Sequence, residues 1–332
     1  MPKAFFLLIA AVCFPLWSSV ARADSTLLNA SYDVAREFYA EFNPQFAQYW
    51  HETSGEKVTV NQSHGGSSKQ ARSVADGLAA DVVTLNQATD LDFLASKGLI
   101  ARDWSERFPS GASPFTSTIV FVVRKGNPKQ IKNWDDLVKP GVSVIIANPK
   151  TSGNGRYSYL AAWGYARKAS GNDDKVAKDF VTRLFKNAPV LDTGGRAATT
   201  TFAQRRIGDV LLTFENEAYL AQREFGADKL EIVTPSVSIL AELPVAVVEP
   251  VVEKHGTRKL AEEYLHRLYS PGAQSLAVKH FLRPRDPEIL AKSGGIFPAI
   301  ELLGISEIAG GWTQAQQTHF ADGGLFDQIY LK

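Results

Sequence analysis

Two hydrophobic patterns alternate along most of the chain. Short apolar runs at residues 27–31, 57–61 and 81–85 are typical of buried strands. Between them, apolar side chains recur every three or four residues, as in the aromatic stripe of residues 38–50, and this spacing indicates helices packed on a core. The order strand, helix, strand, helix, strand predicts a parallel sheet with helices on both faces. In such sheets ligands bind at the carboxyl ends of the strands.

A second set of alternating elements follows the apolar run at residues 116–124, which no helix precedes. It contains strand-like runs at residues 142–147 and 210–214, and residues 239–248 then read as a strand that returns to the first set. We therefore predict an α/β fold of two lobes, each a mainly parallel sheet flanked by helices, with a hinged central cleft. The expected division is residues 24–113 plus 240–308 for lobe 1, residues 114–239 for lobe 2, and a C-terminal helical segment at residues 309–332 whose lobe the pattern leaves open.

Three of the loops between a strand and a helix are polar and rich in glycine. They lie within residues 62–74, 148–156 and 190–202, and the second loop precedes a helix expected over residues 157–170. The first N–H groups of a helix have no intrahelical partner, and together with the helix dipole they attract an anion. Ser, Thr, Asn and Gly are also ordinary capping residues, so one such loop alone is explained as a helix cap. Three such loops in one chain favour an anion-binding site.

The first 23 residues have the composition of a Sec-type signal peptide. Lys3 precedes an apolar stretch, and Ala21-Arg-Ala23 fits the small-x-small cleavage rule, so we expect cleavage after Ala23 and an exported chain that begins at Asp24. The apolar stretch is too short for a membrane-spanning helix. The only cysteine, Cys13, would be removed with it, so the exported chain could form no disulfide. We expect the protein in the bacterial periplasm.

The charge balance excludes several classes of partner. The 332 residues carry 36 basic and 35 acidic side chains, and removal of residues 1–23, which contain Lys3 and Arg22 but no acid, leaves 34 basic against 35 acidic. A net charge this close to zero gives no long-range attraction to nucleic acid or to an anionic membrane. Any bound anion must therefore be held by local donors.

Motifs of enzymes and metal sites are weak in this chain. The six histidines show none of the tight spacings of metal sites, and we expect no metal and no cofactor. Pro149-Lys150-Thr151 lacks the glycine that precedes the lysine of a phosphate-binding loop. Ser67 lacks the second glycine of a nucleophile elbow. We expect a binding protein and no enzyme; a secreted hydrolase is the alternative.

Several segments resemble the signature segments of bacterial periplasmic sulfate/thiosulfate-binding proteins, with the thiosulfate-binding branch the more similar. The resemblance covers essentially the whole chain after residue 23. It implies a type II periplasmic-binding-protein fold that captures sulfate or thiosulfate and delivers it to the permease of a membrane ABC transporter for sulfur uptake. We also expect a monomer. The segments that carry the resemblance are residues 31–33, 62–70, 124–128, 148–156, 192–196, 269–271 and 310–312.

The resemblance also implies roles for particular residues, with the oxyanion held by hydroxyl and backbone N–H donors. In the sulfate-binding members an indole N–H falls where this chain has Phe214, and Phe214 together with Asn86 matches the thiosulfate-binding branch. Behind these groups we expect Asp33, His64 and Arg196, of which the last two would polarise peptide units that touch the ligand. The expected ligand-binding residues are Ser67, Ser152, Gly153, Asn154, Gly195, Asn86 and Phe214.

A site built from neutral donors has a predictable selectivity. Hydrogen bonds to a charged group contribute about 1.5–3 kcal/mol each, so about five of them could give micromolar affinity after desolvation is subtracted. Sulfate has no proton to give, whereas hydrogen phosphate must donate one and would meet another donor. Phosphate, molybdate and tungstate are the alternative ligands. Near the site, we expect Arg156 to pair with a carboxylate and Lys150 to face solvent.

Overall fold

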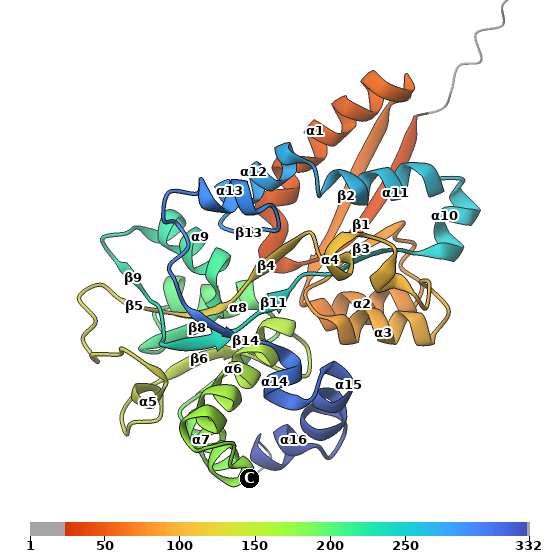
Figure 1. Ribbon diagram of the computed structural model, residues 1–332. Helices are drawn as coiled ribbons and strands as arrows, with labels where there is room; N and C mark the ends of the chain where they lie inside the picture. Colours follow the sequence, from red (N-terminus) through yellow and green to blue (C-terminus); the bar gives the residue numbers. More distant parts are fainter. Residues whose placement is uncertain (1–23, 331–332) are drawn as a thin grey trace, which may run out of the picture.

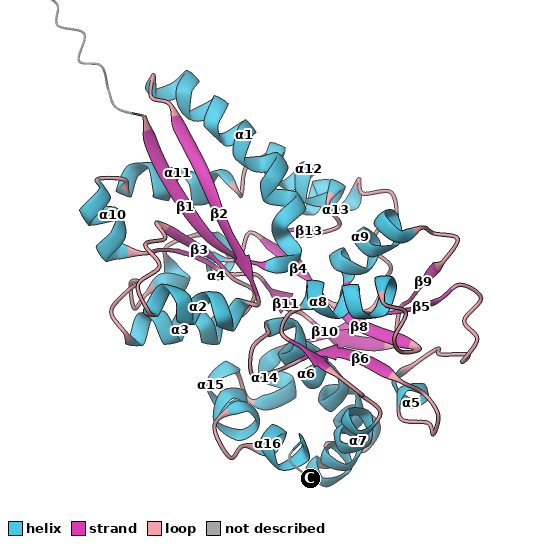
Figure 2. Ribbon diagram, turned by 180° about the vertical axis from the view of Figure 1, so that it is seen from behind, coloured by secondary structure: helices cyan, strands magenta, loops and turns pink. Residues whose placement is uncertain are grey.

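The computed structural model describes residues 24–330 as two α/β lobes, and strands connect one lobe to the other (Figures 1 and 2). The predicted signal peptide at residues 1–23 lies outside the described residues. The two-lobe α/β architecture expected from the hydrophobic pattern is confirmed, since each lobe contains its own sheet with helices against it.

The sheet of the first lobe has the strand order β12-β3-β1-β2. Strand β1 is parallel to β2 and β3, whereas β12 is antiparallel to β3 and arrives from much later in the chain. The aromatic stripe of α1 is buried as predicted, and the rings of Phe42 and Phe46 lie 5.3 and 5.0 Å from that of Tyr264. The elements of this lobe are β1 (Ser25–Tyr32), η1 (Asp33–Ala35), α1 (Arg36–Ser54), β2 (Val58–Gly65), α2 (Ser67–Ala75), β3 (Val82–Thr84), α3 (Ala88–Ser96), η2 (Trp104–Glu106), α4 (Pro109–Ala112), β12 (Val245–Val247), α10 (Glu249–His255), α11 (Arg258–Arg267) and α12 (Pro271–Lys279).

The sheet of the second lobe has five strands in the order β7-β6-β8-β5-β9. Strand β6 is parallel to β7 and β8, and β5 is antiparallel to β8 and β9. The elements of this lobe are β5 (Ile119–Arg124), α5 (Trp134–Leu137), β6 (Val144–Ala147), α6 (Gly153–Ala169), α7 (Asp174–Lys186), β7 (Leu191–Asp192), α8 (Gly195–Thr199), η3 (Thr200–Gln204), β8 (Val210–Phe214), α9 (Glu215–Phe225), β9 (Leu230–Val233) and β10 (Val237–Ile239).

Both connections between the lobes are broken strands. The run predicted as one strand at residues 116–124 divides at Thr118, whose hydroxyl donates to the Ile239 carbonyl at 2.8 Å. The return strand divides at Leu243-Pro244, because proline cannot donate to a ladder and the chain changes sheets here. The connecting elements are β4 (Phe115–Ser117), β11 (Ala241–Glu242), which pairs antiparallel with β4, β13 (Arg283–Pro284) and α13 (Pro287–Ala291).

The C-terminal segment lies against the second lobe. Strand β14 pairs with β10, α14 packs on α6 and α16 packs on α7, as the blue and green helices of Figure 1 show. These contacts favour a division near residue 300, in place of the expected 308; the lobe boundaries stay a prediction. The elements are β14 (Glu301–Leu303), α14 (Ile305–Ala309), α15 (Trp312–Ala315), η4 (Gln316–Phe320) and α16 (Leu325–Tyr330).

Candidate functional site

Three helices begin at the interface between the lobes without a side-chain cap. Helix α2 begins at Ser67, α6 at Gly153 and α8 at Gly195, and none of the preceding residues accepts a hydrogen bond through its side chain. The first N–H groups of α2 and α6 are therefore open to a ligand, whereas at the start of α8 the Arg196 N–H already donates to Asp33 of the first lobe. Helix α7 differs, because the Asp173 carboxylate accepts from two N–H groups of its first turn.

The lobes touch directly at Gly66, which precedes α2. A Cβ at this position would lie 2.6 Å from the Thr151 carbonyl oxygen and 2.8 Å from that of Thr193, both in the second lobe. The backbone angles of Gly66 are ordinary, with φ −57° and ψ 138°. Glycine is needed here because two backbones approach closely, and turn geometry plays no part.

Two more glycines lie at contacts between the lobes. A Cβ on Gly153 would overlap the side-chain oxygen of Asn86, and a Cβ on Gly194 would overlap a carboxylate oxygen of Asp33. The starts of α6 and α8 are thus pressed against the carboxyl ends of β3 and β1. Residues far apart in the sequence meet here, as the resemblance implied for the site.

Ser67 belongs to a buried hydrogen-bond network on the first lobe. Its hydroxyl donates to Asp90 at 2.6 Å and accepts from the Asn86 backbone N–H at 3.2 Å. The Gln87 amide donates to the same Asp90 oxygen at 2.7 Å and to the Ser68 hydroxyl at 2.8 Å. The hydroxyl proton of Ser67 therefore already has an acceptor, and donation to a ligand would require it to turn away from Asp90.

On the second lobe the polar groups near the helix starts are less engaged. Ser152 is 1 % exposed and makes no cap hydrogen bond. The Asn154 side-chain amide donates to the Thr213 hydroxyl at 3.0 Å, and an added Cβ on Gly195 would lie 3.1 Å from its nitrogen. The side-chain oxygens of Asn154 and Asn86 are buried and accept no hydrogen bond within the described chain. The surroundings of the helix starts therefore contain acceptors as well as donors.

Phe214 supplies an apolar wall next to Thr213. It is fully buried, and it precedes the first residue of α9. Its ring lies 5.5 Å from that of Tyr157, which in turn lies 5.2 Å from Trp312. Phe214 contributes no hydrogen-bond donor through its side chain.

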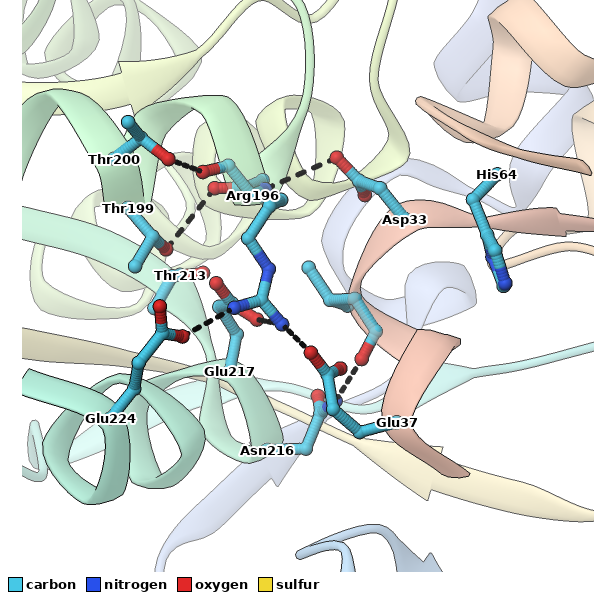
Figure 3. A network of polar contacts seen from close by, with 12 residues as sticks. Asp33, Glu37, His64, Arg196, Thr199, Thr200, Thr213, Asn216, Glu217 and Glu224 are labelled. Carbon is cyan, nitrogen blue, oxygen red and sulfur yellow. Dashed lines mark hydrogen bonds and ion pairs between the residues drawn. The ribbon is translucent and has the colours of Figure 1, made fainter. Parts of the chain in front are cut away.

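Arg196 connects the lobes behind the start of α8 (Figure 3). Its guanidinium pairs with Glu37 of the first lobe at 2.7 Å and with Glu217 and Glu224 of the second lobe at 3.3 and 3.1 Å. Its backbone N–H donates to Asp33 at 3.1 Å. Burial alone would lower the pKa of Arg196, but the surrounding carboxylates raise it.

Carboxyl groups outnumber the single guanidinium in this cluster. Burial raises the pKa of Asp33, and burial raises that of Glu217 to about 8 although Arg196 opposes the shift. Neither oxygen of Glu217 accepts a well-aligned hydrogen bond from residues 24–330. Glu217 is therefore mostly protonated at neutral pH, which reduces the negative charge behind the helix starts.

His64 stands apart from Arg196 and points away from it in Figure 3. Its ring nitrogen Nδ1 lies 3.4 Å from the Tyr32 carbonyl oxygen, and burial lowers the pKa of the imidazole. The peptide unit that contains this carbonyl also carries the N–H of Asp33. A proton on Nδ1 would polarise that N–H.

Two expectations for basic residues near the site are wrong. Arg156 has no carboxylate partner in the described part of the chain; its guanidinium donates to the Pro149 carbonyl and to the side chains of Thr89 and Gln316. Lys150 pairs with Asp327 at 2.9 Å and does not face solvent freely. The side-chain partners Thr89, Gln316 and Asp327 come from distant segments, so local charge patterns gave no sign of them.

Sequence reasoning missed three residues of this region: Asp90, Gln87 and Thr213. Their roles rest on partners 19 to 59 residues away. The available signal for Asp90 and Gln87 was their position, because they follow Asn86 at the carboxyl end of β3 and lie in or next to the first turn of α3.

Two other kinds of site are absent from residues 24–330. This part of the chain has no group of three or more His, Cys, Asp or Glu residues arranged to hold a metal ion. None of its helices combines the length and apolar character needed to cross a membrane.

Comparisons with known proteins show the family of this chain. Residues 27–283 match the family model of bacterial extracellular solute-binding proteins. The chain is 59 % identical to a thiosulfate-binding protein of Pseudomonas aeruginosa, over 93 % of each chain. It is 56 % identical to a sulfate-binding protein of Escherichia coli, over 94 % of this chain and 95 % of the relative.

A solved structure gives the same result for the fold. The sulfate-binding protein SubI from Mycobacterium tuberculosis matches with a TM-score of 0.80 and 32 % identity, covering 88 % of this chain and 98 % of that protein. The expected type II periplasmic-binding-protein fold is thereby confirmed. The chain belongs to the bacterial extracellular solute-binding proteins, in the group that contains the sulfate-binding and thiosulfate-binding proteins.

Proposed function

We propose that this chain binds sulfate or thiosulfate between its lobes and delivers it to an ABC transporter for sulfur uptake. The observation that carries the proposal is that three helix starts without a cap from the preceding side chain lie at glycines where the lobes touch. Open N–H groups and aligned helix dipoles stabilise an anion without a cation. The relatives are named as binding proteins, which favours binding over hydrolysis.

The proposed ligand-binding groups come from both lobes. Ser67 and Asn86 belong to the first lobe, and the second contributes the start of α6, the start of α8 and Phe214. Asp33, His64 and Arg196 support these groups from behind, through the contacts described above. The second-lobe ligand groups are Ser152, Gly153, Asn154 and Gly195.

Within this function we propose a preference for thiosulfate over sulfate. An indole N–H at this position would donate to the fourth oxygen of sulfate, but Phe214 presents an apolar ring with no donor. Thiosulfate has a terminal sulfur in place of that oxygen, and this larger, softer atom can lie against the ring. Phe214→Trp should therefore shift the affinity ratio toward sulfate by roughly ten-fold or more, the worth of one hydrogen bond to an anion. Competition calorimetry measures the ratio; an unchanged ratio would remove Phe214 as the determinant.

We further propose that the protein acts in the periplasm as a monomer. Residues 1–23 would direct export and be cleaved after Ala23, which mass spectrometry of the exported protein would test. Residues 114–124 and 240–248 would form the hinge on which the lobes close around the ligand. The permease of the transporter would then recognise the closed form.

Calorimetry with a panel of tetrahedral oxyanions tests the ligand class. We expect sulfate and thiosulfate to bind in the micromolar range or tighter, on the order of 8 kcal/mol, and phosphate, molybdate and tungstate to bind more weakly. Tighter binding of phosphate, molybdate or tungstate would replace the proposed ligand. Steady turnover of a sulfate ester would replace the proposed function with the hydrolase alternative.

A further inference from the structure

A second polar cavity lies on the second lobe at the outer ends of β5 and β9. Its volume is about 520 Å³, and its walls carry four cationic side chains over an apolar floor. In Figure 2 β9 and the neighbouring part of β5 lie at the edge of the lobe that faces away from the first lobe. The cations are Arg124, Lys125, Arg206 and Lys229, and the floor contains Phe225 and Leu230.

The cavity is separate from the cleft between the lobes. Ile119 at one end of β5 pairs with Phe214 at the cleft, and Arg124 lies at the other end, paired with Leu230. Five residues along a strand correspond to roughly 16 Å. A ligand in this cavity would not touch the helix starts of the cleft.

The four cations have no acidic partners. Among residues 24–330 no carboxylate oxygen lies within 4.0 Å of their side-chain nitrogens, although ion pairs are frequent elsewhere in this chain. Two acids near the cavity are engaged with other groups: Asp209 accepts from the Ser143 N–H, and Glu231 accepts from the Gly126 N–H. The four cations of this cavity therefore form no ion pair with a described residue, although the charge of Asp209 raises the pKa of Arg124 against the larger effect of burial.

Arg124 is held in a fixed position at the cavity wall. Its Nη2 donates to the carbonyls of Phe202 at 2.9 Å and Gly208 at 3.2 Å, and its guanidinium lies 3.9 Å from the centre of the Phe202 ring. Burial lowers the pKa of Arg124, and the charge of Arg206 lowers it further. A guanidinium fixed in this way needs no reorganisation when an anion arrives.

Arg206 adopts a backbone conformation that is unfavourable for its type. Its φ is +60°, in the left-handed region, which costs a side chain other than glycine about 1 kcal/mol. Arg206 is the fourth cation that lines the cavity, beside Arg124, Lys125 and Lys229. Both the backbone strain and the like-charge repulsion are unfavourable in the free protein, and a bound anion would offset the repulsion.

We propose that this cavity binds a small organic anion with a sulfonate or phosphate group on an apolar ring. The cations would hold the tetrahedral head group, with Arg124 as the fixed donor, and the ring would lie on Phe225 and Leu230. The proposal is independent of the sulfate or thiosulfate function, since it concerns a different end of the sheet.

The test uses 2-naphthalenesulfonate and 2-naphthyl phosphate with the full chain, while thiosulfate is present to occupy the cleft. Amide shifts in NMR spectra should concentrate at residues 203–206, 124–125 and 229–230. Arg206→Asn removes the charge of Arg206, and asparagine tolerates the left-handed backbone conformation at this position. We expect this variant to bind each naphthyl anion about ten-fold more weakly, and we expect the same of Lys229→Gln. The exposed Lys254 of the first lobe provides the matched control, Lys254→Gln, which should change nothing.

The two probes distinguish the head groups, and 2-naphthol tests whether the charge is needed. Binding of either anion with shifts at this cavity supports the proposal, and the stronger of the two identifies the preferred head group. Shifts spread over the surface, equal binding of 2-naphthol, or equal weakening by Lys254→Gln would overturn it, as would no binding at millimolar concentration. Failure of thiosulfate to bind would affect only the function proposed for the cleft, because the NMR shifts locate each ligand.

Discussion

The two faces of the cleft differ in the kind of group that they present. The second-lobe face consists mainly of backbone N–H groups at the starts of α6 and α8, with Ser152 making no cap bond. The first-lobe face presents Ser67, whose hydroxyl is tied to Asp90 and to the Asn86 N–H. Loss of the Ser152 hydroxyl on the second face should therefore alter affinity alone, whereas loss of the Ser67 hydroxyl on the first should alter affinity and stability together.

Gly66→Ala should have the largest effect, because it prevents the two faces from meeting. The new methyl group would collide with two backbone carbonyls, of Thr151 and Thr193, which cannot rotate away. Affinity for thiosulfate should fall about a hundred-fold or more, on the order of 3 kcal/mol. The ordinary φ of Gly66 leaves the separate lobes stable, so circular dichroism and the Tm without ligand should change little.

Gly272→Ala is the matched control for this substitution. Gly272 lies in the first turn of α12, and a Cβ there would meet nothing within 4 Å. Its affinity should equal that of the unmodified protein in calorimetry. Full affinity in Gly66→Ala would show that binding does not require the contact between the faces.

Ser152→Ala tests the second face and should give the next largest effect. Loss of one hydrogen bond to a dianion should weaken binding about ten- to a hundred-fold. The Tm without ligand should stay within about one degree, since the hydroxyl caps nothing.

Asp173→Ala is the control for Ser152→Ala, because the Asp173 carboxylate caps α7. This variant should lose about 1 kcal/mol of stability and keep the affinity of the unmodified protein. A Tm loss in Ser152→Ala would make Ser152 a structural residue.

Ser67→Ala tests the first face. Removal of the hydroxyl leaves the Asn86 N–H without its acceptor and Asp90 with one donor fewer. We expect a stability loss of about 1–3 kcal/mol in urea unfolding, together with about ten-fold weaker binding. If stability were unchanged while affinity fell, the two faces would behave alike and the comparison would fail.

Glu217→Gln should have the smallest effect on affinity, about three-fold at most, because Gln replaces a carboxyl group that is already mostly protonated. Its signature is in the pH dependence of stability. The folded pKa of Glu217, about 8, is above the ordinary value of 4.5, so its favourable contribution is complete below pH 4.5 and is lost as the pH rises through 8. The Tm difference between the variant and the original should therefore increase from pH 5 to pH 8.5 in favour of the variant. Parallel Tm curves would contradict the buried, protonated state.

The hydrophobic pattern was sufficient to predict the two lobes and the order of most strands and helices. Buried side chains recur every two residues along a strand and about every 3.6 residues along a helix, so the pattern reports burial directly. The start of α6 was placed too late, at Tyr157 in place of Gly153. Gly153, Asn154 and Gly155 are poor helix formers, so propensity argues against them. Their presence reflects tertiary packing: a Cβ on Gly155 would overlap the Ala147 carbonyl of the preceding strand.

The polar partners of the site could not be predicted from the sequence. Arg196 and Glu37 are 159 residues apart, and Arg156 and Gln316 are 160 apart, so no helical or strand spacing relates them. The glycine-rich loops were detectable because a helix start has a local signature. The residue that accepts the hydroxyl proton of Ser67 was not detectable, since Asp90 has the sequence position of an ordinary residue in the first turn of a helix.

The position of β12 late in the chain determines which sheet can be completed first when the chain folds. The sheet at residues 119–233 needs only strands from that one continuous stretch, so it can be completed once β9 is free to pair. The other sheet must wait for Val245–Val247 to reach Val82–Thr84, and until then β3 has an unpaired edge. A chain cut short before β12 would therefore contain one complete sheet, still without the C-terminal helices that pack on its lobe, and one unpaired strand edge, a combination that favours aggregation.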